Sequence, residues 1–200
     1  MNRYACFVKA VLKPFVWCLM PFTSKGKENI PEGAVMLCSN HASNWDPVLL
    51  YLDLCNKRSE LAVMAKKELM SVPLLGDFLR HLGVFGVNRG NADLGAVKTT
   101  LRCLKENKRV LIFPEGTRVY RAGKVKAKGG AVMMAVRAGV PVVPVYVGGQ
   151  KRLLRPVWIY YGEPYYPAEA GRKLSPTETQ ELTDELMERI YSLPHRGKTC

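Results

Sequence analysis

Two side chains, His41 and Asp46, could together perform proton transfer. They lie five positions apart, between a buried apolar run at 35–38 and a helix that we expect to begin with Asp46 as N-cap and Pro47 as first residue. Five residues of continuous helix would turn the two side chains about 140° apart, so a contact between them requires a bend. With that bend, the carboxylate can hold one ring nitrogen while the other accepts a proton. The alternative is that Asp46 only caps the helix and His41 is a polar turn residue.

Two basic residues could bind an anion near this pair. Arg89 lies in the turn Gly-Val-Asn-Arg-Gly after an apolar run, and its guanidinium has the planar fork that matches a phosphate. Lys128 precedes two glycines at the start of a predicted helix, where backbone N–H groups can approach an anion. Each residue, taken alone, has the simpler explanation of a solvated basic turn.

The segment 113–118, Phe-Pro-Glu-Gly-Thr-Arg, follows a third apolar run at 110–113. It brings a carboxylate (Glu115), a hydroxyl (Thr117) and a guanidinium (Arg118) to the carboxyl end of a strand. Backbone N–H groups beside Gly116 can approach an anion closely. Because complementary ionisable groups recur at three strand ends, a shared reaction site is favoured over three incidental turns.

The composition indicates one globular domain of 200 residues, of which 48% are hydrophobic. Its 30 Lys and Arg against 17 Asp and Glu give a net charge of +13, which favours an anionic partner such as phospholipid, nucleic acid or a phosphorylated substrate. The six cysteines form no C-x-x-C pair and no zinc-finger spacing with histidine, so we expect free thiols in a reducing compartment and no structural metal.

Short apolar runs alternate with amphipathic ones, which predicts an α/β fold with a central mostly parallel or mixed sheet flanked by helices. The expected strands are 35–39, 61–65, 83–87, 110–113, 142–147 and 158–161. The expected helices are 47–54, 73–82, 91–107, 129–138 and 177–192. Ser-Pro-Thr-Glu at 175–178 has the residue pattern of a capping box for the last helix.

The N-terminal segment 3–22 is apolar and aromatic but is interrupted by Lys9 and Lys13, and its uninterrupted apolar part is too short to span a bilayer. Helical spacing places its apolar residues on one face, with the lysines opposite. That pattern is typical of a helix lying among lipid headgroups. We expect Pro14 to divide it into two short pieces. The alternative is an amphipathic helix packed on the domain.

The chain resembles the glycerolipid acyltransferases, specifically the 1-acylglycerol-3-phosphate acyltransferases. Four blocks occur in the family's order, at 40–46, 86–89, 113–118 and 140–145, and the segments 66–69 and 73–76 are also similar. The similarity extends over about residues 30–165. One departure is Val119, where many relatives have a serine.

The resemblance implies transfer of an acyl group from acyl-CoA or acyl carrier protein to the free hydroxyl of a lysophospholipid, giving phosphatidic acid, with no cofactor. By the family pattern His41 is the general base, Asp46 orients it and Arg89 binds the acceptor's phosphate. The block Glu115, Gly116, Thr117 and Arg118 holds the acceptor and the transition state. We add Lys128 to these binding residues because it adjoins the glycines.

The resulting prediction is a membrane-interface segment at 1–24 followed by an acyltransferase domain at 25–200, on the cytoplasmic face of a bacterial membrane. Two alternatives stay open. The acceptor could be glycerol-3-phosphate or another lysophospholipid, or the chain could be a non-catalytic basic module that binds membrane or nucleic acid. The second alternative explains the charge but not the ionisable residues at three strand ends.

Overall fold

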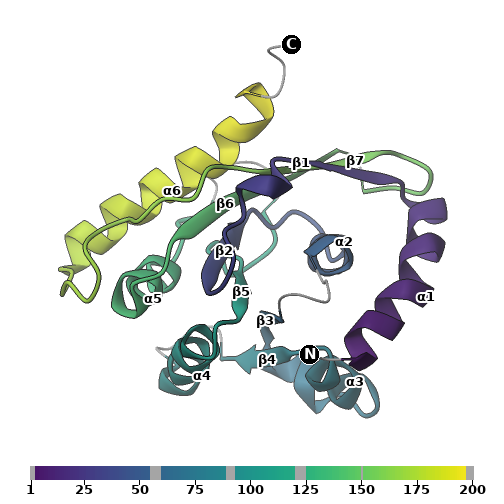
Figure 1. Ribbon diagram of the computed structural model, residues 1–200, viewed down its shortest axis with the longest axis horizontal. Helices are drawn as coiled ribbons and strands as arrows, with labels where there is room; N and C mark the ends of the chain where they lie inside the picture. Colours follow the sequence, from purple (N-terminus) through teal and green to yellow (C-terminus); the bar gives the residue numbers. More distant parts are fainter. Residues whose placement is uncertain (1–2, 55–59, 89–92, 120–124, 150, 197–200) are drawn as a thin grey trace.

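The protein is built around one seven-stranded mixed sheet with the strand order β1-β7-β6-β2-β5-β3-β4 (Figure 1). The computed structural model describes residues 3–54, 60–88, 93–119, 125–149 and 151–196. The strands are β1 (Phe22–Lys25), β2 (Val35–Ser39), β3 (Leu61–Lys66), β4 (Val84–Val87), β5 (Arg109–Ile112), β6 (Val142–Gly149) and β7 (Val157–Tyr161). Strands β2 to β6 run parallel, β7 is antiparallel to β6, and β1 is parallel to β7. The expected α/β fold with a mixed central sheet is confirmed.

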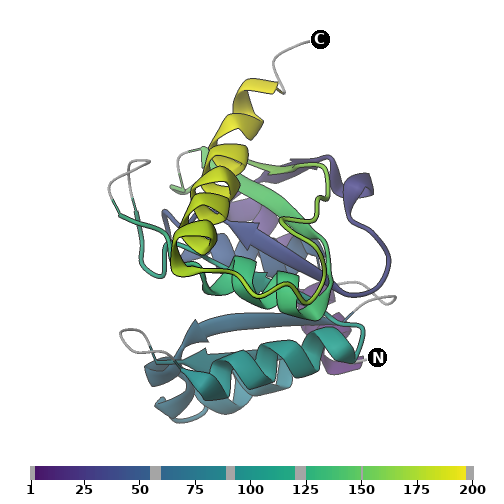
Figure 2. The same cartoon turned by 90° about the vertical axis from the view of Figure 1, so that its left-hand side faces the viewer.

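Helices cover both faces of this sheet (Figures 1 and 2). They are α1 (Arg3–Leu19), α2 (Trp45–Leu54), α3 (Leu75–His81), α4 (Leu94–Lys105), α5 (Gly130–Ala138) and α6 (Pro176–Arg196), with two short 3-10 helices at Lys27–Asn29 and Lys67–Ser71. One apolar core joins the sheet to α1 and α2, and a second joins it to α4, α5 and α6. The central strands β2 and β5 are buried along their whole lengths, as expected for strands covered on both sides.

The predicted elements are present with small shifts at their ends. Strand β1 was not predicted, because only Phe22 of its four residues is buried and the sequence there has no regular alternation. Residues 73–74, expected to be helical, precede α3, since Leu74 has a positive φ of 62° that no α-helix contains. The capping box is confirmed. The Ser175 N–H donates to Glu178 Oε2 at 2.9 Å and the Glu178 N–H donates to Ser175 Oγ at 3.2 Å.

Helix α1 is continuous from Arg3 to Leu19, so the expected division at Pro14 is wrong. The carbonyl that lost its helical partner belongs to Ala10, and this residue is exposed and therefore accessible to water. No helix in the described part of the chain is long and apolar enough to cross a membrane.

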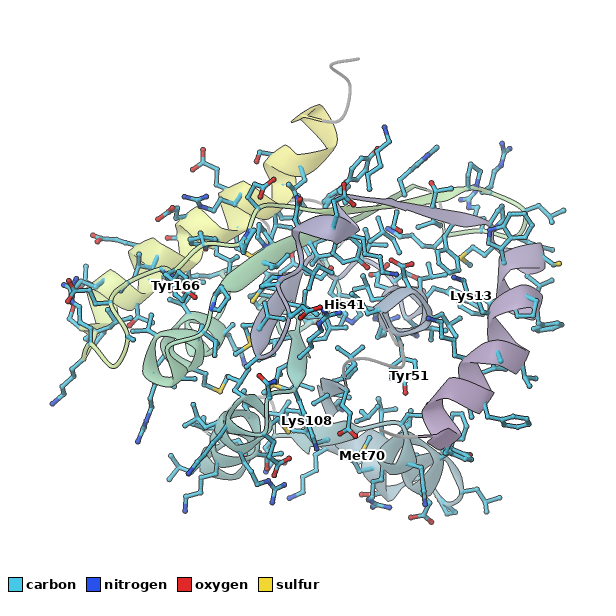
Figure 3. All side chains as sticks on the ribbon, in the orientation of Figure 1. Lys13, His41, Tyr51, Met70, Lys108 and Tyr166 are labelled. Carbon is cyan, nitrogen blue, oxygen red and sulfur yellow. The ribbon has the colours of Figure 1, made fainter. Side chains whose placement is uncertain are left out.

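The two sides of α1 differ from the expected arrangement. Lys9 and Lys13 are only half-exposed, and Lys13 lies on the side facing the domain, with its ammonium 5.7 Å from the ring centre of Phe22 (Figure 3). Val8 and Val16 pack into the core. An apolar stripe instead faces away from the domain, and we call it the α1 stripe: Phe7, Val11 and Phe15.

Candidate active site

The candidate site lies where β2, β5 and β6, three neighbouring parallel strands, reach their carboxyl ends. Strand β2 leads into α2 on one face of the sheet, and the next helix after β5, α5, belongs to the core of the other face. The loops that follow the two strands therefore lead to opposite faces of the sheet. Open α/β sheets form their ligand sites where neighbouring loops separate in this way. Figure 3 shows His41 at this position, between the sheet and α2.

His41 and Asp46 are in contact. Nδ1 of His41 lies 3.3 Å from Oδ2 of Asp46, and the two residues are 7% and 0% exposed. The imidazole also packs on Phe113, with the ring centres 4.5 Å apart. With the hydrogen on Nδ1, the Asp46 carboxylate fixes the ring and Nε2 is the proton acceptor. The bend required by the sequence is therefore present.

Asp46 is not the helix cap that the sequence predicted. Helix α2 begins one residue earlier, at Trp45, and the Trp45 N–H donates to Ser43 Oγ at 3.2 Å. The Asp46 carboxylate points back along the chain, where Oδ2 accepts the N–H groups of Ala42 and Ser43, both at 2.6 Å. The same oxygen thus holds both the loop and the imidazole. Its hydrogen bonds go to the loop before α2 and not to the first N–H groups of the helix.

The backbone of His41 is held from both sides by the loop that follows β5. Its N–H donates to Glu115 Oε2 at 2.7 Å, and its carbonyl accepts the N–H of Val119 at 2.7 Å. Val119 acts here through its main chain and buries its side chain. The departure from the family's serine at this position therefore leaves this contact unchanged.

Glu115 is 3% exposed and uses both of its oxygens inside the protein. Besides the His41 N–H on Oε2, it accepts the hydroxyl of Tyr191, on α6, on Oε1 at 2.6 Å. Burial raises the pKa of Glu115 above its ordinary value, and the bonds from Tyr191 and His41 oppose that rise. The structure thus gives Glu115 a positioning role that the sequence did not predict.

Lys151, two residues after the end of β6, supplies a cation to this cluster. Its Nζ lies 3.7 Å from Oδ1 of Asp46 and donates to the Val147 carbonyl at 2.8 Å, and its side chain is 10% exposed. Burial lowers the pKa of Lys151, while the Asp46 carboxylate acts in the opposite direction.

The remaining predicted residues lie around the same loop. Gly116 has φ of 64°, and a Cβ placed on it would lie 3.3 Å from Cε of Lys128, so the lysine stem packs directly on this glycine. Thr117, Arg118 and Lys128 are exposed, as ligand-binding side chains at a site mouth would be. The prediction for Arg89 falls outside the described residues.

Sequence reasoning missed Lys151 and Tyr191. Lys151 follows a strand end as the other site residues do, which is the signal that would have indicated it. Tyr191 adjoins the buried Ile190 of α6, and nothing in its sequence surroundings distinguishes it from packing residues. In the part of the chain that the structure describes, no group of three or more His, Cys, Asp or Glu residues could hold a metal ion.

The chain is similar to known proteins over most of its length. The Acyltransferase family model matches residues 21–148. The 1-acyl-sn-glycerol-3-phosphate acyltransferase of Bacillus subtilis is 33% identical over 177 residues, which are 85% of this chain and 86% of that protein. The Saccharomyces cerevisiae enzyme of that name is 32% identical over 168 residues, 80% of this chain and 52% of its own length.

Other relatives are matched over a smaller part of their length. The Pseudomonas aeruginosa enzyme of the same name is 36% identical over 124 residues, and the match spans 60% of this chain and 47% of that one. Among solved structures, the crystal structure of the 1-acyl-sn-glycerophosphate acyltransferase from Thermotoga maritima superposes with a TM-score of 0.71 at 25% identity, covering 100% of this chain and 82% of that one. Motifs, fold and relatives agree, and the chain belongs to the Acyltransferase family.

Proposed function

We propose that the protein transfers an acyl group from a thioester to the free hydroxyl of 1-acylglycerol-3-phosphate, giving phosphatidic acid, with His41 as general base. The observation that carries the proposal is the buried contact of 3.3 Å between His41 Nδ1 and Asp46 Oδ2. The acceptor is taken from the names of the relatives, which include enzymes from Bacillus subtilis and Saccharomyces cerevisiae.

The proposed reaction is direct and needs no acyl-enzyme. His41 Nε2 takes the proton of the acceptor hydroxyl while its oxygen attacks the thioester carbonyl carbon. The tetrahedral intermediate then expels the thiolate, and the imidazolium returns the proton to the sulfur. The products are an ester and a free thiol. A positioned base of this kind contributes about 10²–10⁴-fold to the rate.

Cations of the loop after β5 are assigned to the negative charges of the reaction. The Gly116 N–H donates to the Phe113 carbonyl at 3.0 Å, so it is committed to the turn rather than directed at an oxyanion. Arg118 and Lys128 present exposed cationic side chains close to this turn, and we assign them to the acceptor's phosphate and the developing oxyanion. By resemblance, Arg89 joins them in binding the phosphate.

A peripheral position on a membrane completes the proposal, because acceptor and product are lipids. The α1 stripe faces away from the domain, and Phe7 and Phe15 within it are 67% and 63% exposed. Isolated exposed apolar residues are ordinary, but a row of aromatic ones on one helix marks an interaction surface. We assign this surface to the interfacial layer of a phospholipid membrane and the pathway to phospholipid biosynthesis.

The test is a panel of acceptors and donors assayed with the purified protein. Lysophosphatidic acid, glycerol-3-phosphate and lysophosphatidylcholine are each offered with acyl-CoA and with acyl carrier protein. We expect lysophosphatidic acid to be the preferred acceptor, and the donor arm decides between the two thioesters. Preference for the zwitterionic lysolipid would contradict the proposed acceptor.

His41→Ala is expected to reduce acyl transfer by about 10³-fold or more, because the reaction loses its base. His81→Ala is the matched control, since it removes an exposed imidazole on α3 and leaves the site intact. Retained activity in His41→Ala, with the thermal unfolding midpoint unchanged, would refute the mechanism. Loss of activity in both variants would point to a general effect on folding.

A further inference from the structure

Two buried carboxylates converge on His41, and their oxygens are not equally satisfied. Glu115 accepts a hydrogen bond on each oxygen, and Asp46 Oδ2 accepts two N–H groups besides contacting the imidazole. Asp46 Oδ1 is buried and has no hydrogen-bond partner among the residues that the structure describes. A buried carboxylate oxygen without a partner is costly unless a charge lies nearby.

The charge that lies nearby is Lys151. Its Nζ is 3.7 Å from Asp46 Oδ1, too long for a hydrogen bond but within ion-pair distance. The Val147 carbonyl holds this ammonium at 2.8 Å and also accepts Asn40 Nδ2 at 3.2 Å. Asn40 directly precedes His41. The Val147 carbonyl therefore holds both Lys151 and the loop that carries His41.

We propose that Lys151 is a positioning residue that sets the charge balance of the His41–Asp46 pair, so that the imidazole both accepts a proton and releases it. The inference rests on the proposed function, because it assumes that His41 is the base. Among the described residues, the charged groups around the imidazole are Asp46 from α2, Glu115 from the loop after β5 and Lys151 from the segment after β6. Tyr191 of α6 donates to Glu115.

The physical argument concerns the second half of the reaction. Two carboxylates without a cation would stabilise the imidazolium so strongly that returning its proton to the leaving thiolate would become difficult. One ammonium offsets one of the two negative charges and leaves the imidazolium only moderately stabilised. It also lies within ion-pair distance of Asp46 Oδ1, the buried oxygen for which the described residues provide no hydrogen bond.

Direct binding of the acceptor's phosphate is the competing role for this lysine. The geometry disfavours it, because the side chain is 10% exposed and its ammonium already contacts the Val147 carbonyl and Asp46. Lys128, by contrast, is exposed at the loop after β5 and is free of that burial.

The experiment measures kcat/KM against pH for the full chain and for two variants, with lysophosphatidic acid in neutral detergent micelles and the preferred thioester donor. Lys151→Met removes the charge and the hydrogen bond, whereas Lys151→Gln removes the charge and keeps a donor for the Val147 carbonyl. Loss of the cation favours the protonated imidazole, so the acid limb of both profiles is expected to move to higher pH by about one unit. The KM for the acceptor is expected to stay within about twofold, since the lysine acts through Asp46.

Lys151→Arg and Lys27→Met complete the set. Lys151→Arg keeps the charge and is expected to return the profile toward that of the intact protein. Lys27→Met breaks another lysine–aspartate pair, in which Nζ lies 2.9 Å from Oδ1 of Asp53, at the far end of α2 from the site. It is expected to lower the thermal midpoint without moving the profile.

Two results would overturn the inference. A large rise in KM for the acceptor with an unmoved profile would make Lys151 a phosphate-binding residue. A lower thermal midpoint with an unmoved profile in Lys151→Met and Lys151→Gln would make it only structural. His41→Ala, assayed beside them, separates this failure from failure of the proposed function. If His41→Ala is active, His41 is not the base and the proposed function itself fails.

Discussion

Oxygen Oδ2 of Asp46 determines how the site is organised at the scale of single residues. It contacts the imidazole and accepts the N–H groups of Ala42 and Ser43, so the carboxylate that orients the proposed base also shapes the loop on which that base lies. A charged acceptor strengthens each of these hydrogen bonds. Orientation of the ring and geometry of the loop are therefore properties of one carboxylate.

Asp46→Asn is expected to lower kcat by about 10²-fold or more while KM changes little, because the amide can still accept the two N–H groups but no longer stabilises an imidazolium. Steady-state kinetics with both substrates varied would measure the two parameters. Asp53→Asn is the matched control, since it neutralises a second buried aspartate at the other end of the same helix, where its partners are Lys27 and Tyr161. Equal losses of kcat in both variants would contradict the role given to Asp46.

Residue types and spacing were enough to find the His41–Asp46 pair, because the two lie on one short loop. The contacts of Glu115 and Lys151 could not be predicted, because these residues lie far from His41 in the sequence. Each depends on which strands are neighbours in the sheet, and the order β6-β2-β5 cannot be obtained from residue periodicity along the chain. The cap was misplaced because a carboxylate before proline has the same sequence pattern whether it points forward into the helix or back into the loop.

At the scale of elements, α6 is part of the site support and not only a cover for the sheet. Its buried residues Leu186 and Ile190 pack in the core, and Tyr191, the next residue, donates to Glu115. Glu115 in turn accepts the His41 N–H. The last helix thus reaches the backbone of the proposed base through a single carboxylate.

Tyr191→Phe is expected to move the acid limb of kcat/KM to higher pH. Burial already raises the pKa of Glu115, and the Tyr191 hydroxyl opposes that rise, so its removal raises the pKa further. Glu115 then becomes protonated at a higher pH and holds the His41 N–H less well. The measurement is a pH–rate profile.

Tyr146→Phe serves as the control for Tyr191→Phe, because the Tyr146 ring lies beside that of Tyr191, with centres 6.0 Å apart. The hydrogen bonds that Glu115 accepts from described residues come from His41 and Tyr191 and not from Tyr146. A Tyr191→Phe profile that coincides with that of the intact protein would reduce α6 to a packing role.

Element boundaries followed from the sequence where apolar alternation is strong and failed where it is weak. Strands β2, β5 and β6 are buried runs bounded by turn residues and were predicted within two residues. The β1 strand has one buried residue, so its existence depends on pairing with β7. Helix α1 continues through Pro14 because the turns on either side of the proline pack on the core at Val8 and Val16.

At the scale of the whole molecule, α1 joins the domain on one side and presents the α1 stripe on the other. Phe7→Ser with Phe15→Ser is expected to weaken binding to phosphatidylglycerol vesicles by about tenfold or more, since each buried phenylalanine contributes about 1.5–3 kcal/mol. Co-sedimentation with vesicles would measure it. Activity on a short-chain acceptor dissolved as monomers is expected to be retained.

Tyr166→Ser is the control for this pair of substitutions. Tyr166 is also exposed, at 64%, but it lies on the side of the molecule away from α1 (Figure 3). Equal vesicle binding by the phenylalanine double variant and by the intact protein would contradict the assignment of the α1 stripe to a membrane.

The pairing of β1 with β7 has a consequence for the order of events during synthesis. Phe22 pairs with Val157, so the strand that fixes the end of α1 needs a partner encoded near the other end of the chain. Because proteins leave the ribosome amino terminus first, α1 emerges while the side that it will later pack on the core is still open to solvent. If the proposed attachment to a membrane begins during translation, both sides of this helix are accessible to lipid before the fold closes. Only the side that packs on the core then has to leave the lipid.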